Sequence, residues 1–575
     1  MSEPTGLAEN WATLWEAIAV RQPADVAVVV GDRHITWASL DGRASRLATA
    51  LTCSGIQPGG KVAQMMYNCP EYLESAYAAF KVRASTVNVN YRYRAPEVVH
   101  IVDDSDAEVL VYHHSFAGVV EEARRSLPKL RLLVEVEDPG APLEGGADGP
   151  HVQGASRYED LIAANSPVTP IARSGNDELL LYTGGTTGRP KGVVWRHADL
   201  FWAMAFNGYA AQGLPVPDTP EEVGLVAAEL RRAGSSPVNM TAPPLMHGTA
   251  LFLAMSTFVM GGTVVLLAGR HFDPVELLQL VERERVTQLS IVGDAFARPI
   301  VAELQRADEA GEPYDLSSLT RIVSTGATLS AVHKQQLMQR ATNASVLDMV
   351  GASEGGPFAM AITPPGADPI ATAQFVSTPV TTVFDPETWE RIEPGSGRSG
   401  VLAASGPIPL GYYKDPVKTA STFREIGGVR YSVPGDHAMV DADGIVHLLG
   451  RGSVCINTGG EKVFPEEVEV VARQLAGIED CLAVGVADDR FGEIVVLVAS
   501  RTPEATVEPA AVIDHVKRHL AAYKAPRDVV FVEHFYRSPS GKADYRWARD
   551  VASRALGRSG SVERGAGAPI GTVHG

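Results

Sequence analysis

The sequence predicts an α/β protein with a large N-terminal domain, rich in parallel βαβ units, and a small α+β C-terminal domain. At 575 residues the chain is too long for one ordinary core. Short apolar runs at residues 26–30, 61–66, 109–112 and 132–136 are mostly separated by helical stretches, which is typical of parallel sheets. A Gly-Arg-Gly-Ser turn at residues 450–453 then precedes a fresh series of strands and helices.

We expect the domain boundary at this turn, which gives domains at residues 1–450 and 451–551. Within the second domain, residues 482–486 and 494–500 read as strands and residues 510–522 as a helix. Residues 552–575 are rich in Gly, Ala, Ser and Arg, so we expect a disordered tail. The charged stretch 215–237 looks like an insertion or a lid.

The overall composition excludes several classes of protein. A net charge of −18 and a pI near 5.3 argue against nucleic acid as a partner, because binding a phosphate backbone needs a basic face. Four scattered cysteines without CxxC spacing indicate neither a zinc site nor a disulfide framework: Cys53, Cys69, Cys455 and Cys481. The first residues lack the pattern of a signal peptide, so we expect a cytoplasmic protein.

Residues 250–269 carry no charge and are long enough to cross a bilayer. Gly261 and Gly262 divide this segment into a helix-like part and a β-branched part. We therefore expect a helix that leads into a buried parallel strand, and no stable insertion into a membrane.

Residues 182–192 form a glycine and hydroxyl loop that suits a polyphosphate. Glycine lets backbone N–H groups approach phosphate oxygens, threonine hydroxyls donate further hydrogen bonds, and a lysine adds charge. The loop is not a Walker A motif, because Lys191 lies between Pro190 and Gly192. It is a candidate ATP site formed by Thr183, Gly184, Gly185, Thr186, Thr187, Gly188 and Lys191.

This loop resembles the phosphate-binding signature of the adenylate-forming superfamily, which includes acyl-CoA synthetases, adenylation domains and luciferases. Further motifs follow in the order of that superfamily, and the resemblance covers residues 24–549. The chain departs from the usual pattern at Gly184, where the family has serine, and at Val350, where it commonly has an aromatic residue. The resemblance implies that ATP and CoA are co-substrates and that Mg²⁺ is a cofactor.

The resemblance also implies roles for individual residues of the first domain. Glu354 would hold Mg²⁺ against the phosphates, with Thr183 as a further metal ligand, and carboxylate oxygen suits this hard cation. His247 corresponds to the family residue near the substrate carboxylate, although a lone histidine is more often structural. The remaining nucleotide contacts would come from Gly326, Ala327, Val350, Gly351, Ser353, Asp436 and Arg451.

In the second domain, Gly459, Gly460 and Glu461 resemble the loop that meets the CoA thiol in the second half-reaction. Lys542 matches the lysine that acts in adenylation, where it would stabilise charge at the α-phosphate. The implied reaction therefore requires the small domain to rotate between two faces. Ser453 occupies the position of the usual family pivot, an aspartate or lysine.

The resemblance places residues 243–249 where amino-acid-activating adenylation domains carry an aspartate for the substrate's ammonium group. This stretch has no acidic residue, so the predicted substrate is a hydrophobic carboxylic acid. The local sequences at residues 192–197, 450–457 and 542–548 resemble actinobacterial ligases for steroid side-chain acids such as 3-oxocholestenoate. The alternatives are a general medium- or long-chain fatty acyl-CoA ligase and a fatty acyl-AMP ligase that loads a carrier protein in trans. Apolar residues at 251–258 could line an acyl pocket but read more readily as core, and a homodimer stays open.

Overall fold

The computed structural model describes residues 7–138, 151–183, 190–205, 208–458, 461–488, 491–520, 522–537 and 542–557. Side chains at positions 205, 211, 451, 453, 457, 461, 462 and 492 fall outside this description. Two compact units, Met1–Leu448 and Leu449–Gly575, divide the chain. The predicted fold class is confirmed, since the large unit contains parallel-rich sheets and the small unit mixes helices with a separate sheet.

One sheet of the large unit contains strands from both sides of the glycine loop. Neighbouring strands run parallel from β8 through to β7, whereas β9 and β19 are antiparallel additions at the other edge. In spatial order the strands are β19 (Gly411–Tyr412), β9 (Lys191–Arg196), β8 (Glu178–Thr183), β4 (Ser85–Asn88), β3 (Lys61–Met65), β5 (Val109–His113), β6 (Leu132–Val136) and β7 (Ser156–Arg157). Three of the four predicted apolar runs thus form β3, β5 and β6.

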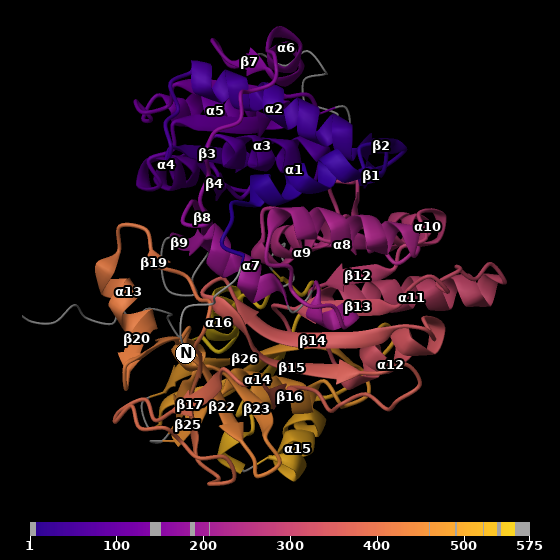
Figure 1. The fold of residues 1–575 in the computed structure, drawn as a ribbon. Coiled ribbons are helices and arrows are strands. Elements are labelled where there is room, and N and C mark those ends of the chain that lie inside the picture. Colours follow the sequence, from indigo (N-terminus) through magenta and orange to yellow (C-terminus); the bar gives the residue numbers. More distant parts are fainter. Residues whose placement is uncertain are drawn as a thin grey trace, which may run out of the picture. The chain divides into compact units, whose positions relative to one another are not determined.

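Helices cover both faces of this sheet (Figure 1). Because successive strand residues point to opposite faces, Val109 and Val111 of β5 join the core that contains α2 (Trp37–Cys53) and α3 (Pro70–Lys81). Leu110 and Tyr112 join the core that contains α4 (Ala95–Asp104) and α5 (Ala117–Arg124). Burial on both faces explains why the run is continuously apolar instead of alternating.

The second sheet of the large unit has a parallel middle part with antiparallel strands on both sides. Strands β1, β11, β10, β12, β13 and β14 are parallel neighbours in that order, whereas β2 is antiparallel to β1 and β15 is antiparallel to β14. The spatial order is β2 (Arg33–Thr36), β1 (Val26–Val30), β11 (Thr263–Leu266), β10 (Val238–Thr241), β12 (Gln288–Ile291), β13 (Arg321–Thr325), β14 (Ser345–Ala352), β15 (Gly355–Thr363), β16 (Gln374–Ser377), β23 (Ile445–Arg451), β22 (Asp436–Val440), β18 (Ser399–Ala404), β21 (Val429–Ser432) and β20 (Phe423–Ile426), with β17 (Thr381–Phe384) paired to β18.

In the described part of the large unit, five of the other helices start at a side-chain cap, and three of these also have a proline in the first turn, as helix N-termini prefer. Asn10 caps the first of them through the N–H of Ala12 at 2.7 Å. The other helices are α1 (Trp11–Arg21), α6 (Tyr158–Ala164), α7 (His197–Ala205), α8 (Pro220–Arg232), α9 (Gly248–Phe258), α10 (Pro274–Arg283), α11 (Asp294–Ala310), α12 (Ala331–Arg340) and α13 (Pro416–Thr422), with short 3₁₀ turns η1 (His114–Phe116) and η2 (Ala210–Gln212).

The stretch predicted as an insertion or lid is a packed part of the fold. Helix α8 buries Val223, Ala227 and Leu230, and it lies against α1. A Cβ at Gly224 would lie 2.7 Å from the carbonyl oxygen of Ala17, so the two helices approach at backbone distance. The lid interpretation was wrong, because the polar residues of this segment occupy only the outer face of an amphipathic helix.

The uncharged segment 250–269 forms the helix and strand that its glycines predict. Every residue of α9 from Ala250 to Phe258 is buried, and β11 pairs in parallel with β1 and β10. The residues considered for an acyl pocket, Leu251, Phe252, Met255 and Phe258, all lie in the main hydrophobic core. Among the described residues, no helix has the length and apolarity needed to span a membrane.

The small unit contains its own sheet and two hydrophobic clusters. Its strands are β25 (Glu461–Val463), β24 (Ile456–Thr458), β27 (Gly492–Arg501), β26 (Ile478–Asp488) and β28 (Asp528–Phe531), the last of which pairs with β27. Its helices are α14 (Pro465–Ala472), α15 (Pro509–His519) and α16 (Tyr545–Ala555), with short 3₁₀ turns η3 (Gly452–Val454) and η4 (Ala522–Lys524). The strands and the helix predicted for this region are therefore confirmed.

Candidate active site

The two ends of the glycine loop lie side by side on adjacent strands. Antiparallel pairing of β8 with β9 places Thr183 opposite Lys191 and Tyr182 opposite Gly192. A Cβ at Gly192 would lie 2.7 Å from the Tyr182 ring, so the close strand pairing requires glycine at this position. The predicted phosphate contacts Gly184, Gly185, Thr186, Thr187 and Gly188 lie outside the described residues.

Lys191 forms an ion pair with Asp415, a partner that the sequence motifs do not reveal. Asp415 also caps α13, where it accepts a hydrogen bond from the N–H of Lys418 at 2.8 Å. The hydrogen bond from Lys191 holds the pKa of the Asp415 carboxyl below its ordinary value. The ammonium group of Lys191 is thus positioned by a carboxylate that lies more than two hundred positions away in the sequence.

Asn88 joins the end of β8 to the segment that contains His247. Its amide donates to the carbonyl of Tyr182 at 2.9 Å and to that of Met246 at 2.7 Å, and its oxygen accepts from the N–H of Tyr182 at 2.6 Å. His247 follows directly as the N-cap residue of α9. The structure therefore brings His247 to the end of the strand that leads into the glycine loop.

A second group of predicted residues lies at the ends of β13 and β14, which pair in parallel with Thr325 opposite Met349. Gly326 has φ +89°, a conformation that favours glycine, and it starts the turn that continues through Ala327. A Cβ on Gly351 would lie 3.3 Å from the Thr325 hydroxyl. These two loops are therefore neighbours. The side chain of Val350 is buried in a hydrophobic cluster and does not project into the space beside these loops.

Glu354 and its neighbour Ser353 are held by side chains from two strands of the first sheet and one strand of the second. The Tyr412 hydroxyl donates to Oε1 of Glu354 at 2.6 Å. The indole N–H of Trp195 donates to the carbonyl of Ser353 at 3.0 Å, and the Ser432 hydroxyl donates to the carbonyl of Glu354 at 2.6 Å. Because Trp195 belongs to β9 and Tyr412 to β19, Glu354 is tied to the strand that begins at Lys191.

The remaining predicted residues are placed less completely. Asp436 begins β22, next to Gly435 with φ +102°. Arg451 ends β23 and Glu461 begins β25, but both side chains lie outside the description, as do Gly459 and Gly460 entirely. Lys542 has an exposed side chain and follows residues 538–541, which are also outside the description.

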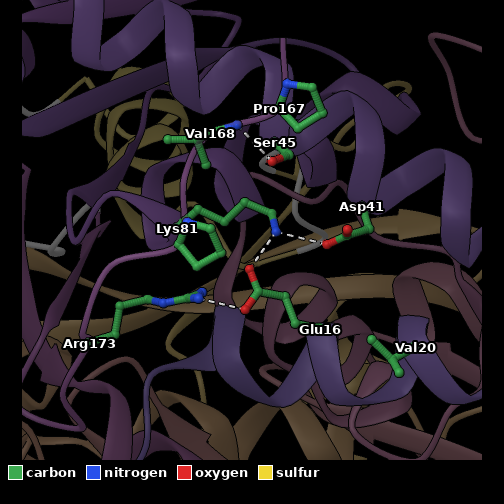
Figure 2. Close-up of a pocket in the computed structure, with 9 residues that line it drawn as sticks. Glu16, Val20, Asp41, Ser45, Lys81, Pro167, Val168 and Arg173 are labelled. Atoms are coloured by element: carbon green, nitrogen blue, oxygen red, sulfur yellow. Dashed lines mark hydrogen bonds and ion pairs between the residues drawn. The ribbon is translucent and has the colours of Figure 1, made fainter.

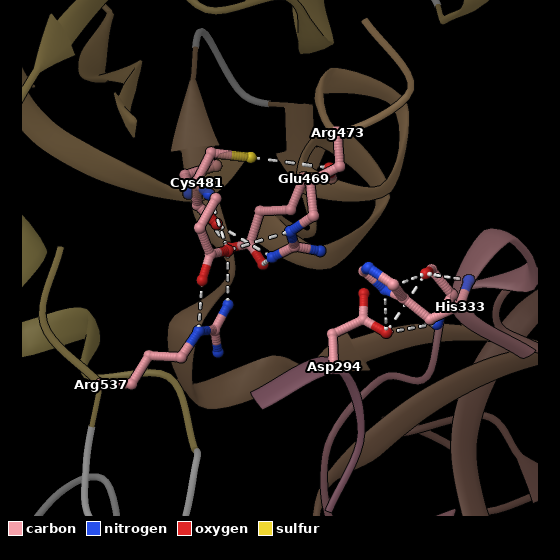
Figure 3. A network of polar contacts seen from close by, with 9 residues as sticks. Asp294, His333, Glu469, Arg473, Cys481 and Arg537 are labelled. Carbon is pink, nitrogen blue, oxygen red and sulfur yellow. Dashed lines mark hydrogen bonds and ion pairs between the residues drawn. The ribbon is translucent and has the colours of Figure 1, made fainter. Parts of the chain in front are cut away.

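A buried ion-pair network holds Arg537, which precedes Lys542 by five positions (Figure 3). Arg537 also forms an antiparallel bridge with Ala543, the residue after Lys542. Arg537 binds Asp480 through two nitrogens, at 2.6 and 2.8 Å, and Arg473 binds the same carboxylate at 3.2 Å. Arg473 in turn contacts Glu469 at 3.0 Å, and burial raises the pKa of Glu469 despite this neighbouring charge.

A pocket elsewhere in the large unit lies between α1, α2 and α3 (Figure 2). Its charged side chains bind each other: Lys81 contacts Glu16 at 2.6 Å and Asp41 at 2.8 Å, while Arg173 contacts Glu16 at 2.5 Å. Charges that satisfy one another inside a packed helical layer indicate a structural role. We assign no ligand to this pocket.

Comparison with known protein families gives the class that this fold and site define. The AMP-binding enzyme family matches residues 15–413, and the AMP-binding enzyme C-terminal domain matches residues 467–542. The chain therefore belongs to the AMP-binding enzyme family, and the resemblance stated from its motifs is confirmed.

Characterised relatives are similar over nearly the whole chain. A 3-oxocholest-4-en-26-oate–CoA ligase of Rhodococcus rhodochrous is 39% identical over 546 residues, which are 95% of this chain and 96% of the relative. The medium-chain acyl-CoA ligase Mig of Mycobacterium avium is 39% identical over 554 residues, 93% of this chain and 97% of the relative.

Solved structures share the fold. An anthranilate–CoA ligase in complex with anthranoyl-AMP has a TM-score of 0.79 at 24% identity, covering 96% of this chain and 99% of its own. ATP-bound MatB from Rhodopseudomonas palustris has a TM-score of 0.76 at 25% identity, covering 95% of this chain and 99% of its own.

Proposed function

We propose that this protein is an AMP-forming acid–thiol ligase that activates a hydrophobic carboxylic acid to its CoA thioester. The observation that carries this proposal is the end-to-end similarity to ligases that are named for this reaction. In the first step the acid's carboxylate attacks the α-phosphorus of ATP, which forms acyl-AMP and releases pyrophosphate. In the second step the CoA thiolate attacks the acyl carbon and expels AMP.

The residues of the large unit would bind ATP and the acid. Thr183 and Lys191, at the two stems of the glycine loop, would contact the phosphates, with Gly326, Ala327, Gly351, Ser353 and Asp436 around the nucleoside. The hydrogen bond from Tyr412 leaves the Glu354 carboxylate with a second oxygen, and its hard donor suits Mg²⁺. Glu354, together with Thr183, would hold that ion, which supplies charge neutralisation at the phosphates when bound.

The small unit would supply Lys542 to the first step and the face of Gly459, Gly460 and Glu461 to the second. An ammonium near the reacting carboxylate and α-phosphate would stabilise the charge that develops between them. Because different residues would serve the two steps, a single mutation should impair one step and spare the other. A protein that only binds nucleotides, without catalysing a reaction, would show neither effect.

For the acid, we propose a steroid side-chain acid or another bulky acid, since one relative acts on 3-oxocholest-4-en-26-oate. A general medium- or long-chain fatty acid is the second candidate, favoured by the equal identity to the medium-chain ligase. Location in the cytoplasm and assembly as a homodimer stay predictions.

The first experiment measures AMP release with ATP and CoA against a panel of acids: a short fatty acid, a long fatty acid, a steroid side-chain acid and an amino acid. Mass spectrometry identifies the thioester. Preference for the steroid acid would support the first candidate, and preference for straight chains the second. Acyl-AMP without any CoA thioester would contradict CoA as acceptor and favour a carrier protein.

Two substitutions test the assignment of the small unit. Lys542→Ala should reduce acid-dependent pyrophosphate release by about 100-fold or more while thiolysis of supplied acyl-AMP continues. Gly460→Leu should do the reverse. Lys517→Ala, on the exposed side of α15, is the matched control and should leave both steps unchanged. Equal loss of both steps in the Lys542 variant would refute its assignment to adenylation.

A further inference from the structure

Two histidines and a glutamate from separate parts of the chain converge at the edge of the first sheet. His114 opens the turn η1 directly after β5, Glu135 lies in the neighbouring strand β6, and His151 comes from the segment before β7. One possible ligand atom from each residue lies within 4.8 Å of the others. None of these residues belongs to the motifs that resemble adenylate-forming enzymes.

The carboxylate of Glu135 is oriented so that one oxygen serves both histidines. Nδ1 of His114 lies 3.1 Å from Oε1 of Glu135, and Nδ1 of His151 contacts the same oxygen. The other oxygen, Oε2, accepts a hydrogen bond from the hydroxyl of Tyr112 at 3.0 Å. A hydrogen bond that fixes the remaining oxygen of a carboxylate is a regular feature of residues that ligate metals.

The contact between His114 and this carboxylate is close but is not a hydrogen bond. Within the described part of the chain, Nδ1 of His114 is buried and makes no hydrogen bond, even though it lies 3.1 Å from Oε1 of Glu135. Leaving a buried ring nitrogen without a hydrogen bond costs free energy. A cation between these atoms would bind the lone pair of Nδ1, so that this nitrogen would no longer need a hydrogen bond.

The spacing and the donor types fit a small transition-metal ion. Two ligands of a tetrahedral zinc ion, each about 2.0–2.1 Å from the metal, are separated by about 3.3 Å. The 3.1 Å between His114 and Glu135 is close to that edge. Two imidazoles and one carboxylate favour zinc and similar ions over Mg²⁺ or Ca²⁺, which prefer oxygen ligands alone.

We propose that His114, Glu135 and His151 form a binding site for one divalent transition-metal cation of the Zn²⁺ type. The side chain of Glu135 is 4% exposed and that of His151 is 53% exposed, so the ion would enter from the side of His151. The site would tie His151 to β6. It is separate from β8, the strand that ends at Thr183, because β5 lies three strand spacings, roughly 14 Å, from β8.

The test uses the full chain, stripped with a chelator and then given Zn²⁺ alone without nucleotide. We expect one equivalent to bind, and Co²⁺ in its place to give the visible absorption of a tetrahedral site. His151→Ala should weaken binding by at least about tenfold, and Tyr112→Phe, which releases Oε2, by roughly tenfold. Zn²⁺ should also raise the melting temperature of the parent chain but not that of His151→Ala.

His34→Ala is the matched control, because His34 forms an exposed pair with Glu284 at 3.0 Å that lacks a second histidine. It should bind Zn²⁺ as the parent does. The proposal is overturned if the parent holds no zinc against a chelator of micromolar affinity, or if His151→Ala and His34→Ala bind equally. Because the side chain of His151 is half-exposed, His151→Ala should fold as the parent does, and its zinc affinity therefore decides the question.

Discussion

Asp480 is the shared carboxylate of the buried ion-pair network in the small unit. Its side chain is 5% exposed and accepts hydrogen bonds from Arg537 at 2.6 and 2.8 Å and from Arg473 at 3.2 Å. It also accepts from the N–H of Cys481 at 2.8 Å. In Asp480→Ala, two guanidinium groups lose a shared buried carboxylate, and breaking a buried pair in this way costs about 3–5 kcal/mol.

That loss should be measured within the small unit, because unfolding of the large unit would hide it. Hydrogen exchange of peptides from β26 and β27 in increasing urea reports the local free energy of opening. With an m value of about 1–3 kcal/mol per M, the midpoint for these strands should fall by at least roughly 1 M. Asp514→Ala, at an exposed position of α15, is the control and should change the midpoint little.

The same variant tests whether this network positions Lys542. Arg537 forms a bridge with Ala543, the neighbour of Lys542, so loss of the carboxylate that holds Arg537 should displace the lysine. A misplacement of about 1 Å costs around 100-fold in rate. Pyrophosphate release should therefore fall more than thiolysis does, under conditions where the unit remains folded. A stability change below about 1 kcal/mol would refute the argument, because the carboxylate would then contribute no more than a surface pair does.

Two further predictions concern the large unit. Tyr412→Phe removes the hydrogen bond to Glu354 and should raise the Mg²⁺ concentration needed for half-maximal pyrophosphate release about tenfold. The control Tyr413→Phe loses a hydrogen bond to Asp106 and should not change this concentration. Equal Mg²⁺ dependence of the two variants would contradict the role of Glu354. Burial lowers the pKa of His197 from 6.5 to about 4, so the unfolded state binds the proton more readily and stability should decrease as the pH falls from 6.5 to 4. The loss is about 3 kcal/mol and should be absent from His197→Asn in urea titrations at both pH values, so an unchanged slope in that variant would refute this assignment.

The sequence alone was sufficient to predict those strands and helices that a local residue pattern determines. The apolar runs at 61–66, 109–112 and 132–136 became β3, β5 and β6, because strands buried on both faces have a continuous apolar signature. Gly261 and Gly262 similarly divided α9 from β11. The interpretation of residues 215–237 as a lid was wrong. The polar residues of an amphipathic helix give the same sequence pattern whether or not its apolar face packs against another helix.

Contacts between distant residues were not predictable from one sequence. Asn88 hydrogen-bonds across 158 positions to Met246, and Lys191 pairs with Asp415 across 224. Neither residue type indicates its partner: an asparagine at a strand end or an aspartate before Pro416 is equally common as a turn or a helix cap. The predicted roles of Gly459, Gly460 and Glu461 stay predictions for another reason, since their side chains or backbones are outside the described residues.

The position of Glu354 shows why the motifs must be combined in three dimensions. The glycine loop belongs to one sheet, whereas the loops after β13 and β14 belong to the other. Parallel strands gather their carboxyl ends only within a sheet, so strand order alone does not bring these motifs together. The connection is made by Trp195 and Tyr412, whose side chains reach Ser353 and Glu354 from β9 and β19. Residues outside the glycine loop and the Glu354 motif therefore hold the predicted metal ligand near the strand that begins at Lys191.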